Sequence, residues 1–132
     1  MTTLDLLEGL HTHLTGFELP QLCSVTLTHS LSEEASVTAQ LAHHTPPQTR
    51  AALLAWADTL TEVSAEAWRV PNGHSVHLSV LGRLSSGAPI RVYAGVAFTE
   101  HGIGADLAPG AATTMALATL REPATPKQVS TQ

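Results

Sequence analysis

The fold is decided by residues 43–60, HHTPPQTRAALLAWADTL, which separate two groups of strand-like sequence. Thr45 can cap a helix, and the two prolines after it suit the first turn, where the missing N–H costs nothing. Apolar side chains then recur at the spacing of one helical face; they are Leu53, Trp56, Ala57 and Leu60. The stretch predicts an amphipathic helix that packs against a sheet, with Trp56 as its anchor.

The start of the chain predicts another helix, over residues 4–14. Thr2 or Thr3 can cap it and Gly16 can end it. Its apolar residues form one helical stripe; they are Leu4, Leu7, Leu10, His11 and Leu14. We expect the two helices to cover the same face of a sheet.

Two alternating stretches lie between the helices. Residues 22–28, LCSVTLT, and residues 35–42, ASVTAQLA, each alternate apolar with polar side chains, which is typical of half-buried strands. Cys23 shares the apolar side of the first strand with Val25 and Leu27. We therefore expect a core cysteine, with no role as a nucleophile.

Three more strands follow the second helix, at about residues 63–70, 74–84 and 90–98. The link VPNGH fits a turn with Gly73 in the left-handed conformation, and residues 85–89 close the next hairpin. Residues 102–110 read as a loop, whereas 113–120 could add one more strand. The last ten residues, 123–132, have the composition of a disordered tail.

The predicted order is therefore α-β-β-α-β-β-β. Tight connections within each group force antiparallel neighbours. We expect an α+β fold, a two-layer sandwich in which an antiparallel sheet of about five strands carries the helices on one face. Its length of 132 residues suits a single domain, over residues 1–122.

The composition excludes several classes of protein. Hydrophobic residues make up 43% of the chain and charged residues 13%, which indicates a globular domain. The net charge of −5, with six lysines and arginines in total, disfavours nucleic acid as a partner. No apolar run is long enough to span a membrane, and the N-terminus lacks the pattern of a signal peptide, so we expect a cytoplasmic protein. The preference for arginine over lysine is typical of a GC-rich bacterial genome.

Eight histidines raise the question of a metal site. Residues three apart on a strand point to opposite faces, so His74 and His77 cannot bind one ion together. The other close pairs also diverge or lie adjacent; they are His11 with His13 and His43 with His44. The chain contains neither a G-x-S-x-G elbow nor a glycine-rich phosphate loop. We expect no metal, no cofactor and no catalytic residue.

The second face of the predicted sheet is short, polar and poor in lysine and glutamate; it carries Ser24, Thr26, Thr28, Ser36, Thr38, Gln40, Ser75, His77 and Ser79. A loop over 85–89 would place Arg83 opposite Arg91 and Leu81 opposite Tyr93. Two facing arginines require an anionic group, from a neighbouring glutamate, a partner or a ligand, unless both side chains extend into water.

Glu66 depends on the turn that precedes the next strand. A three-residue turn would direct Glu66 into the core and bring Arg69 to the polar face, whereas a bulge or a two-residue turn would shift the register and expose Glu66 to water. Because a buried carboxylate needs a partner or a raised pKa, we expect the shifted register.

These observations favour a non-enzymatic protein-interaction or adaptor module, homodimeric, that uses the serine- and threonine-rich sheet face. The alternative is a small anionic-ligand-binding protein or minor enzyme that uses the same face. In either case the expected binding residues are His77, Arg83, Arg91 and Tyr93.

Overall fold

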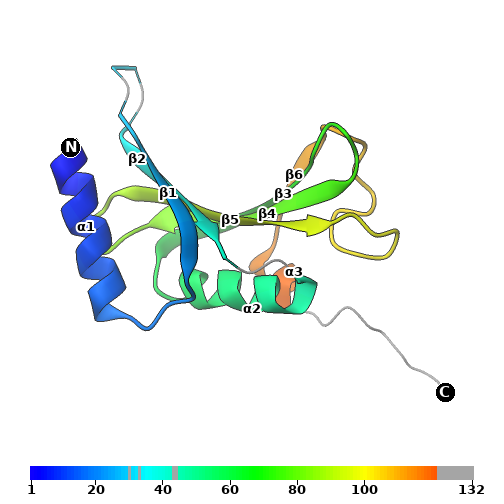
Figure 1. Cartoon of the computed structure of the whole chain (residues 1–132), viewed down its shortest axis with the longest axis horizontal. Coiled ribbons are helices and arrows are strands. Elements are labelled where there is room, and N and C mark those ends of the chain that lie inside the picture. The colour runs from blue at the N-terminus through cyan, green and yellow to red at the C-terminus, as the bar shows by residue number, and fades with distance from the viewer. Residues whose placement is uncertain (30, 33, 43–44, 122–132) are drawn as a thin grey trace.

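A six-stranded sheet with helices on one side forms the body of the molecule (Figure 1). The computed structural model describes residues 1–29, 31–32, 34–42 and 45–121. The elements are α1 (Thr3–Gly16), β1 (Leu22–Thr28), β2 (Ser36–Leu41), α2 (Pro46–Ala57), β3 (Thr61–Arg69), β4 (Ser75–Arg83), β5 (Pro89–Ala97), β6 (Ala112–Met115) and α3 (Leu117–Arg121). The predicted α+β class is confirmed. His43, His44 and the expected tail lie outside the described residues.

The sheet is mixed, whereas the sequence predicted an antiparallel sheet of about five strands. The strand order is β1-β2-β5-β4-β3-β6, and all neighbours are antiparallel except β2 and β5. The chain leaves β2 through α2 and enters β3 on the far side, so the returning meander brings β5 beside β2 in the same direction. The sixth strand, β6, uses only the first part of the segment 113–120, and α3 takes the rest.

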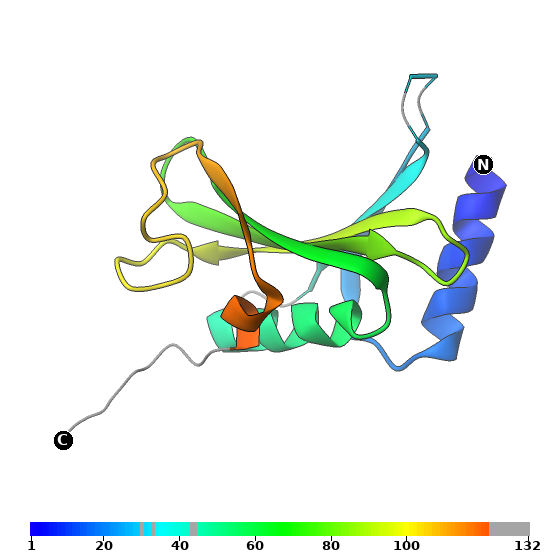
Figure 2. The same ribbon diagram turned by 180° about the vertical axis from the view of Figure 1, so that it is seen from behind.

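Figure 2 shows β6 leading directly into α3, which lies beside α2 under the sheet. Apolar side chains from α2 and from the helix side of β2, β3, β4 and β5 form the core. The predicted apolar residues are all buried, although α2 ends at Ala57 and Leu60 lies just beyond it. The Trp56 side chain is fully enclosed. Its indole N–H donates to the carbonyl oxygen of Pro20 at 3.4 Å. Thr45 occupies the N-cap position but makes no side-chain capping bond.

α1 stands at the end of the sheet, and its predicted stripe is wrong. Leu4, Leu7 and Leu14 are 62%, 49% and 40% exposed. The buried face consists of Leu6, Gly9, Leu10 and His13, of which only Leu10 belongs to the predicted stripe. Gly9 explains the rotation, because a Cβ atom there would lie 2.5 Å from Oγ of Ser86 in the turn between β4 and β5. That turn can approach the helix closely only at the glycine.

His13 links three parts of the fold. Its Nε2 lies 2.8 Å from Oγ1 of Thr59, and its Nδ1 lies 3.1 Å from Oγ of Ser85. The ring is nearly parallel to that of Trp56, with 5.9 Å between the ring centroids. Because the side chain is buried, the pKa of His13 is lowered from its usual value, which favours the neutral ring.

Two smaller expectations are also wrong. Cys23 is exposed, because a β-bulge between Leu22 and Ser24 removes it from the alternating pattern. Its Sγ lies 3.5 Å from the carbonyl oxygen of Leu41. His74 is exposed in the turn that precedes β4, whereas the sequence predicted that the strand begins at this residue.

Candidate functional site

The face of the sheet opposite α2 and α3, here called the open face, carries the polar positions that the sequence identified. Direct strand partners share a face, so the pairing of all six strands fixes its membership. The open face includes Ser24, Thr26, Thr28, Ser36, Thr38, Gln40, Ser75, His77, Ser79, Arg91, Tyr93, Glu66 and Trp68.

The expected pairing of Arg83 with Arg91 is wrong. Arg83 lies opposite Pro89 and Arg91 lies opposite Leu81. The hairpin closes earlier than expected, because the N–H of Leu84 donates to the carbonyl oxygen of Ala88. The loop therefore has only residues 85–87, with Gly87 at φ +91°, and each partner shifts by two residues. Both arginine side chains stay on the predicted face of the sheet, but the residues opposite them differ from those expected.

Each arginine has carboxylate partners within the chain. Nη2 of Arg91 lies 3.1 Å from Oε1 of Glu66, and its Nη1 donates to Oγ of Ser79 at 3.1 Å. Arg83 binds Glu34 at 3.1 Å and Glu62 at 3.2 Å. The anionic groups that the sequence called for are therefore neighbouring glutamates.

The position of Glu66 follows from the turn between β3 and β4. The N–H of Val70 donates to the carbonyl oxygen of Ser75, so four residues, 71–74, form the connection. The extra residue reverses the faces of β3 relative to a three-residue turn. The expected shift of register is thus confirmed, but a longer turn causes it, and not the bulge or two-residue turn that the sequence suggested. Glu66 forms an ion pair with Arg91. Arg69 lies on the helix side, contrary to the alternative that placed it here.

An aromatic row crosses the centre of the open face; it consists of Trp68, His77 and Tyr93. The Trp68 and His77 rings meet edge to face at 5.2 Å, and the His77 and Tyr93 rings stack at 5.3 Å. Gly95 lies opposite His77, and a Cβ atom there would be 3.3 Å from Cδ2 of the imidazole. The glycine therefore lets the imidazole ring lie close to the sheet. At the end of the row, the Tyr93 hydroxyl donates to Oε1 of Gln40 at 3.3 Å.

The imidazole and hydroxyl groups at the centre of this surface make contacts within the chain. Burial lowers the pKa of His77, which favours a neutral imidazole at pH 7. Ser79 is 4% exposed and accepts a hydrogen bond from Arg91, so its hydroxyl is not presented to a substrate. Across the described ranges, no three histidine, cysteine, aspartate or glutamate side chains gather as metal ligands.

Of the four predicted site residues, His77 and Tyr93 belong to the aromatic row, Arg91 lies beside it, and Arg83 lies at the far end of β4 with its own glutamates. Sequence reasoning missed Trp68, whose side of the sheet depends on the length of one turn. The pairing of Gly95 with His77 likewise depends on the length of the 85–87 loop, so the sequence alone did not reveal it.

A second exposed surface lies on α1. Leu4, Leu7 and Leu14, here called the outer stripe of α1, lie on one side of that helix, and each is at least 40% exposed. Phe17 follows the helix and is exposed to a similar degree. Several exposed apolar side chains on one side of a helix are typical of a surface that a partner covers.

No protein-family model, curated protein or solved structure matches the chain. None of the helices in the described part of the chain is long and apolar enough to cross a membrane. Function must therefore be argued from the surfaces themselves.

Proposed function

We propose that this protein is a non-enzymatic interaction module that forms a homodimer through the open face. The composition of the aromatic row carries the proposal. Interface cores are enriched in tryptophan, tyrosine and arginine and depleted in lysine, and these are the residue types that supply most hot spots. Trp68, 37% exposed, and Tyr93 flank His77, with Arg91 beside them.

The balance of charge supports a second copy of this chain as the occupant. A two-fold interface brings the same patch from both chains together, so an excess of one sign would repel. Arg91 is neutralised by Glu66, and Arg83 by Glu34 and Glu62, before any partner arrives. The small serine and threonine side chains of β1 and β2 would let a flat partner approach closely. A reducing cytoplasm, suited to a chain with one cysteine, is the proposed location.

The alternative, an anionic ligand or a minor enzymatic activity at His77, Arg83, Arg91 and Tyr93, has less support. An added anion would have to displace a glutamate from each arginine, and the neutral form of His77 offers no positive charge. The same reasoning disfavours a nucleic-acid phosphate at this face.

The test is the oligomeric state of the full chain across a concentration series, measured by analytical ultracentrifugation. Trp68→Thr keeps a strand-forming residue but removes the largest exposed ring. We expect it to weaken the dimer by about tenfold or more, as the loss of a hot spot does. Leu7→Gln on the outer stripe of α1 is the matched control, and it should leave the dimer unchanged.

Two results would contradict the proposal. A parent protein that stays monomeric at every concentration would remove self-association altogether. A dimer that survives Trp68→Thr and is lost in Leu7→Gln would assign the interface to α1. Circular dichroism of each variant distinguishes a lost contact from a lost fold.

A further inference from the structure

A histidine and a serine are hydrogen-bonded where α1 meets the turn between β4 and β5 (Figure 2). His13 of α1 is 1% exposed, whereas Ser85 of the turn is exposed to solvent. Oγ of Ser85 lies 3.1 Å from Nδ1 of the imidazole ring. A serine hydroxyl at this distance from an imidazole nitrogen can be activated as a nucleophile, provided that the nitrogen carries no proton.

The hydrogen bonds around His13 determine which of its ring nitrogens carries the proton. The Thr59 hydroxyl donates its only proton to the carbonyl oxygen of Trp56, at 2.8 Å. Toward Nε2 of His13, 2.8 Å away, Thr59 can therefore only accept, so Nε2 carries the hydrogen of the neutral ring. Nδ1 is then the acceptor, and the backbone N–H of Ser85 also donates to it, at 3.4 Å. The free electron pair of the ring is thus directed at Ser85.

The surroundings of the ring suit a base that gains a proton for a short time. Burial lowers the pKa of His13, so the ring is neutral at pH 7 and can accept a proton. Once the ring is positive, its Nε2–H makes a stronger, charge-assisted hydrogen bond to Thr59. The ring is also nearly parallel to the Trp56 indole, with 5.9 Å between the centroids, and a cation–π attraction there stabilises the imidazolium.

Ser85 lines a surface hollow of about 630 Å³ beside α1. This volume lies within the range of roughly 300–1,000 Å³ typical of sites for small molecules. The charged groups that line the hollow are the carboxylates of Asp5 and Glu8 and the amino group of Met1, so its rim is negative overall. An acyl group without a negative charge therefore suits this hollow best.

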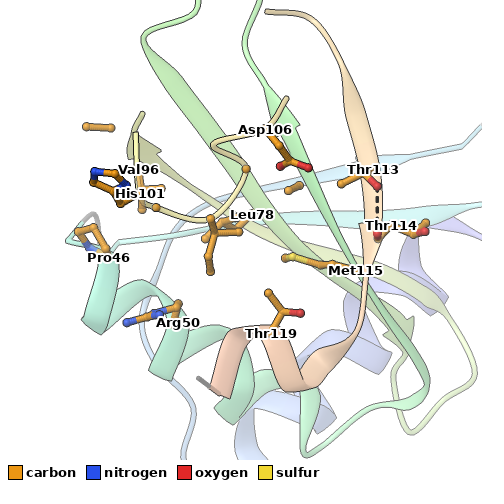
Figure 3. A pocket seen from close by; sticks show the side chains of 15 residues that line it. Pro46, Arg50, Leu78, Val96, His101, Asp106, Thr113, Thr114, Met115 and Thr119 are labelled. Carbon is orange, nitrogen blue, oxygen red and sulfur yellow. Dashed lines mark hydrogen bonds between the residues drawn. The ribbon is translucent and has the colours of Figure 1, made fainter. Parts of the chain in front are cut away.

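A larger hollow, of about 680 Å³, lies on the helix side of the sheet and has no comparable pair (Figure 3). His101 lies on one side of it, and Thr113 and Thr114 lie on the other. Within the described ranges, neither threonine is hydrogen-bonded to the histidine, and the Thr113 hydroxyl donates to the carbonyl oxygen of Thr114. A hydroxyl group without an adjacent base is a weak nucleophile. The reactive hydroxyl is therefore sought at Ser85.

We propose that Ser85 is a covalent acylation site that takes an uncharged acyl group from an activated ester. Oγ of Ser85 attacks the carbonyl carbon, and its proton moves to Nδ1 of His13. The bond between that carbon and the leaving oxygen then breaks, the electron pair stays with the oxygen, and the imidazolium returns the proton to it. The products are the Ser85 ester and a free alcohol.

The reaction stops at one acyl group per chain. Because the ring of His13 is buried, it does not activate a water molecule to hydrolyse the ester. The modification therefore goes beyond the interaction proposed above, and it uses no residue of the open face.

p-Nitrophenyl acetate is a suitable probe. It also reacts with an exposed thiol, so every protein compared carries Cys23→Ser. After the reaction, trypsin releases residues 84–91, LSSGAPIR, in which Ser85 and Ser86 are the only side-chain nucleophiles. Mass spectrometry of this peptide follows the acetylation of each serine with time. We expect Ser85 to react about a hundredfold faster than Ser86, which is the smaller end of what a general base contributes.

Variants and a second probe identify the groups involved. Ser85→Ala should remove the label, whereas Ser86→Ala, the matched control in the same turn, should leave it unchanged. His13→Gln should slow the acetylation of Ser85 to the rate of Ser86. Mono-p-nitrophenyl succinate has an anionic acyl group and should react more slowly than the acetate.

The pH dependence separates a general base from a merely structural hydrogen bond. Because burial lowers the pKa of His13, the ring stays unprotonated, and the rate at Ser85 should be nearly level from pH 8 down to about 6.5. A serine that reacts without a base would slow over the same range in proportion to the hydroxide concentration.

The proposal is overturned if peptide 84–91 of the folded parent gains no acetyl group, or if Ser86 is acetylated as fast as Ser85. It is also overturned if His13→Gln, still folded by circular dichroism, reacts at Ser85 as fast as the parent. A rate at Ser85 that follows the hydroxide concentration would likewise contradict it, and this measurement needs no variant at His13.

Discussion

α1 and α2 carry the same apolar spacing, yet only α2 buries the face that this spacing predicts. Leu53 and Trp56 of α2 are fully enclosed. In α1, Leu4 and Leu7 lie in water, while a histidine and a glycine of the same helix are buried. The difference arises from what each helix meets. α2 runs along the sheet, whereas α1 meets the narrow end of one hairpin.

Apolar spacing therefore identifies a stripe but does not say which element covers it. At the hairpin end, close approach requires Gly9, and Ser85 of the turn is hydrogen-bonded to Nδ1 of His13. Those local contacts outweigh the burial of Leu4 and Leu7. The predicted stripe of α1 remains as exposed apolar surface, and this is why α1 is the rival interface in the test of self-association.

The largest expected effect lies in α2. Trp56→Ala should cost about 3–5 kcal/mol in the free energy of unfolding, since it empties a fully buried core position. Urea denaturation followed by circular dichroism measures this. Trp68→Ala, measured at low protein concentration, should cost less than about 1 kcal/mol, because the ring is partly exposed. Equal losses in the two variants would show that α2 does not anchor the core.

Adjacent leucines test the rotation of α1. Leu6→Ala should cost about 2–5 kcal/mol, as truncation of a buried leucine does. Leu7→Ala, one residue further on, should change the stability of the monomer by no more than about 0.5 kcal/mol. A larger loss of stability in Leu7→Ala than in Leu6→Ala would show that α1 buries the face that the sequence predicted.

His13 joins the two helices, and it makes stability depend on pH. Because burial lowers its pKa in the folded state, the unfolded chain binds a proton more readily. The stability that the buried neutral ring of His13 contributes is therefore complete above the ordinary histidine pKa of about 6.5. It is lost as the pH falls toward the lowered pKa of the folded state. The melting temperature should fall as the pH is lowered below about 6.5.

The slope of the melting temperature against pH tests whether His13 causes this dependence. His13→Gln keeps hydrogen-bonding groups near Thr59 and Ser85 but removes the titrating ring, so its melting temperature should vary less with pH. His11→Gln on the exposed side of the same helix should keep the slope of the parent. An unchanged slope in His13→Gln would mean that other groups cause the pH dependence.

The fold class, α2 and the membership of the polar face were predictable, because each follows from periodicity over many residues. The contacts of the site were not, because each depends on the exact length of a turn. One additional residue between β3 and β4 moves Glu66 and Trp68 to the open face, and a loop shorter by two separates Arg83 from Arg91. A cavity of about 680 Å³ beside α2, β6 and the loop after β5 escaped prediction as well, since its lining comes from segments far apart in the chain.

The smallest expected effect concerns how each helix begins. At α1, the N–H of Asp5 donates to Oγ1 of Thr2, and the N–H of Thr2 donates to the Asp5 carboxylate at 2.8 Å. This backbone hydrogen bond is the main reason that the pKa of Asp5 is lowered. α2 has no such bond at Thr45, and its packing on the sheet holds it in place.

Thr2→Ala should therefore cost about 1 kcal/mol in the free energy of unfolding, whereas Thr45→Ala should cost almost nothing. Because α1 buries only a narrow face, this local cap contributes more to its stability than any cap does at α2. Equal losses in the two variants, measured by urea denaturation, would contradict that difference between the helices.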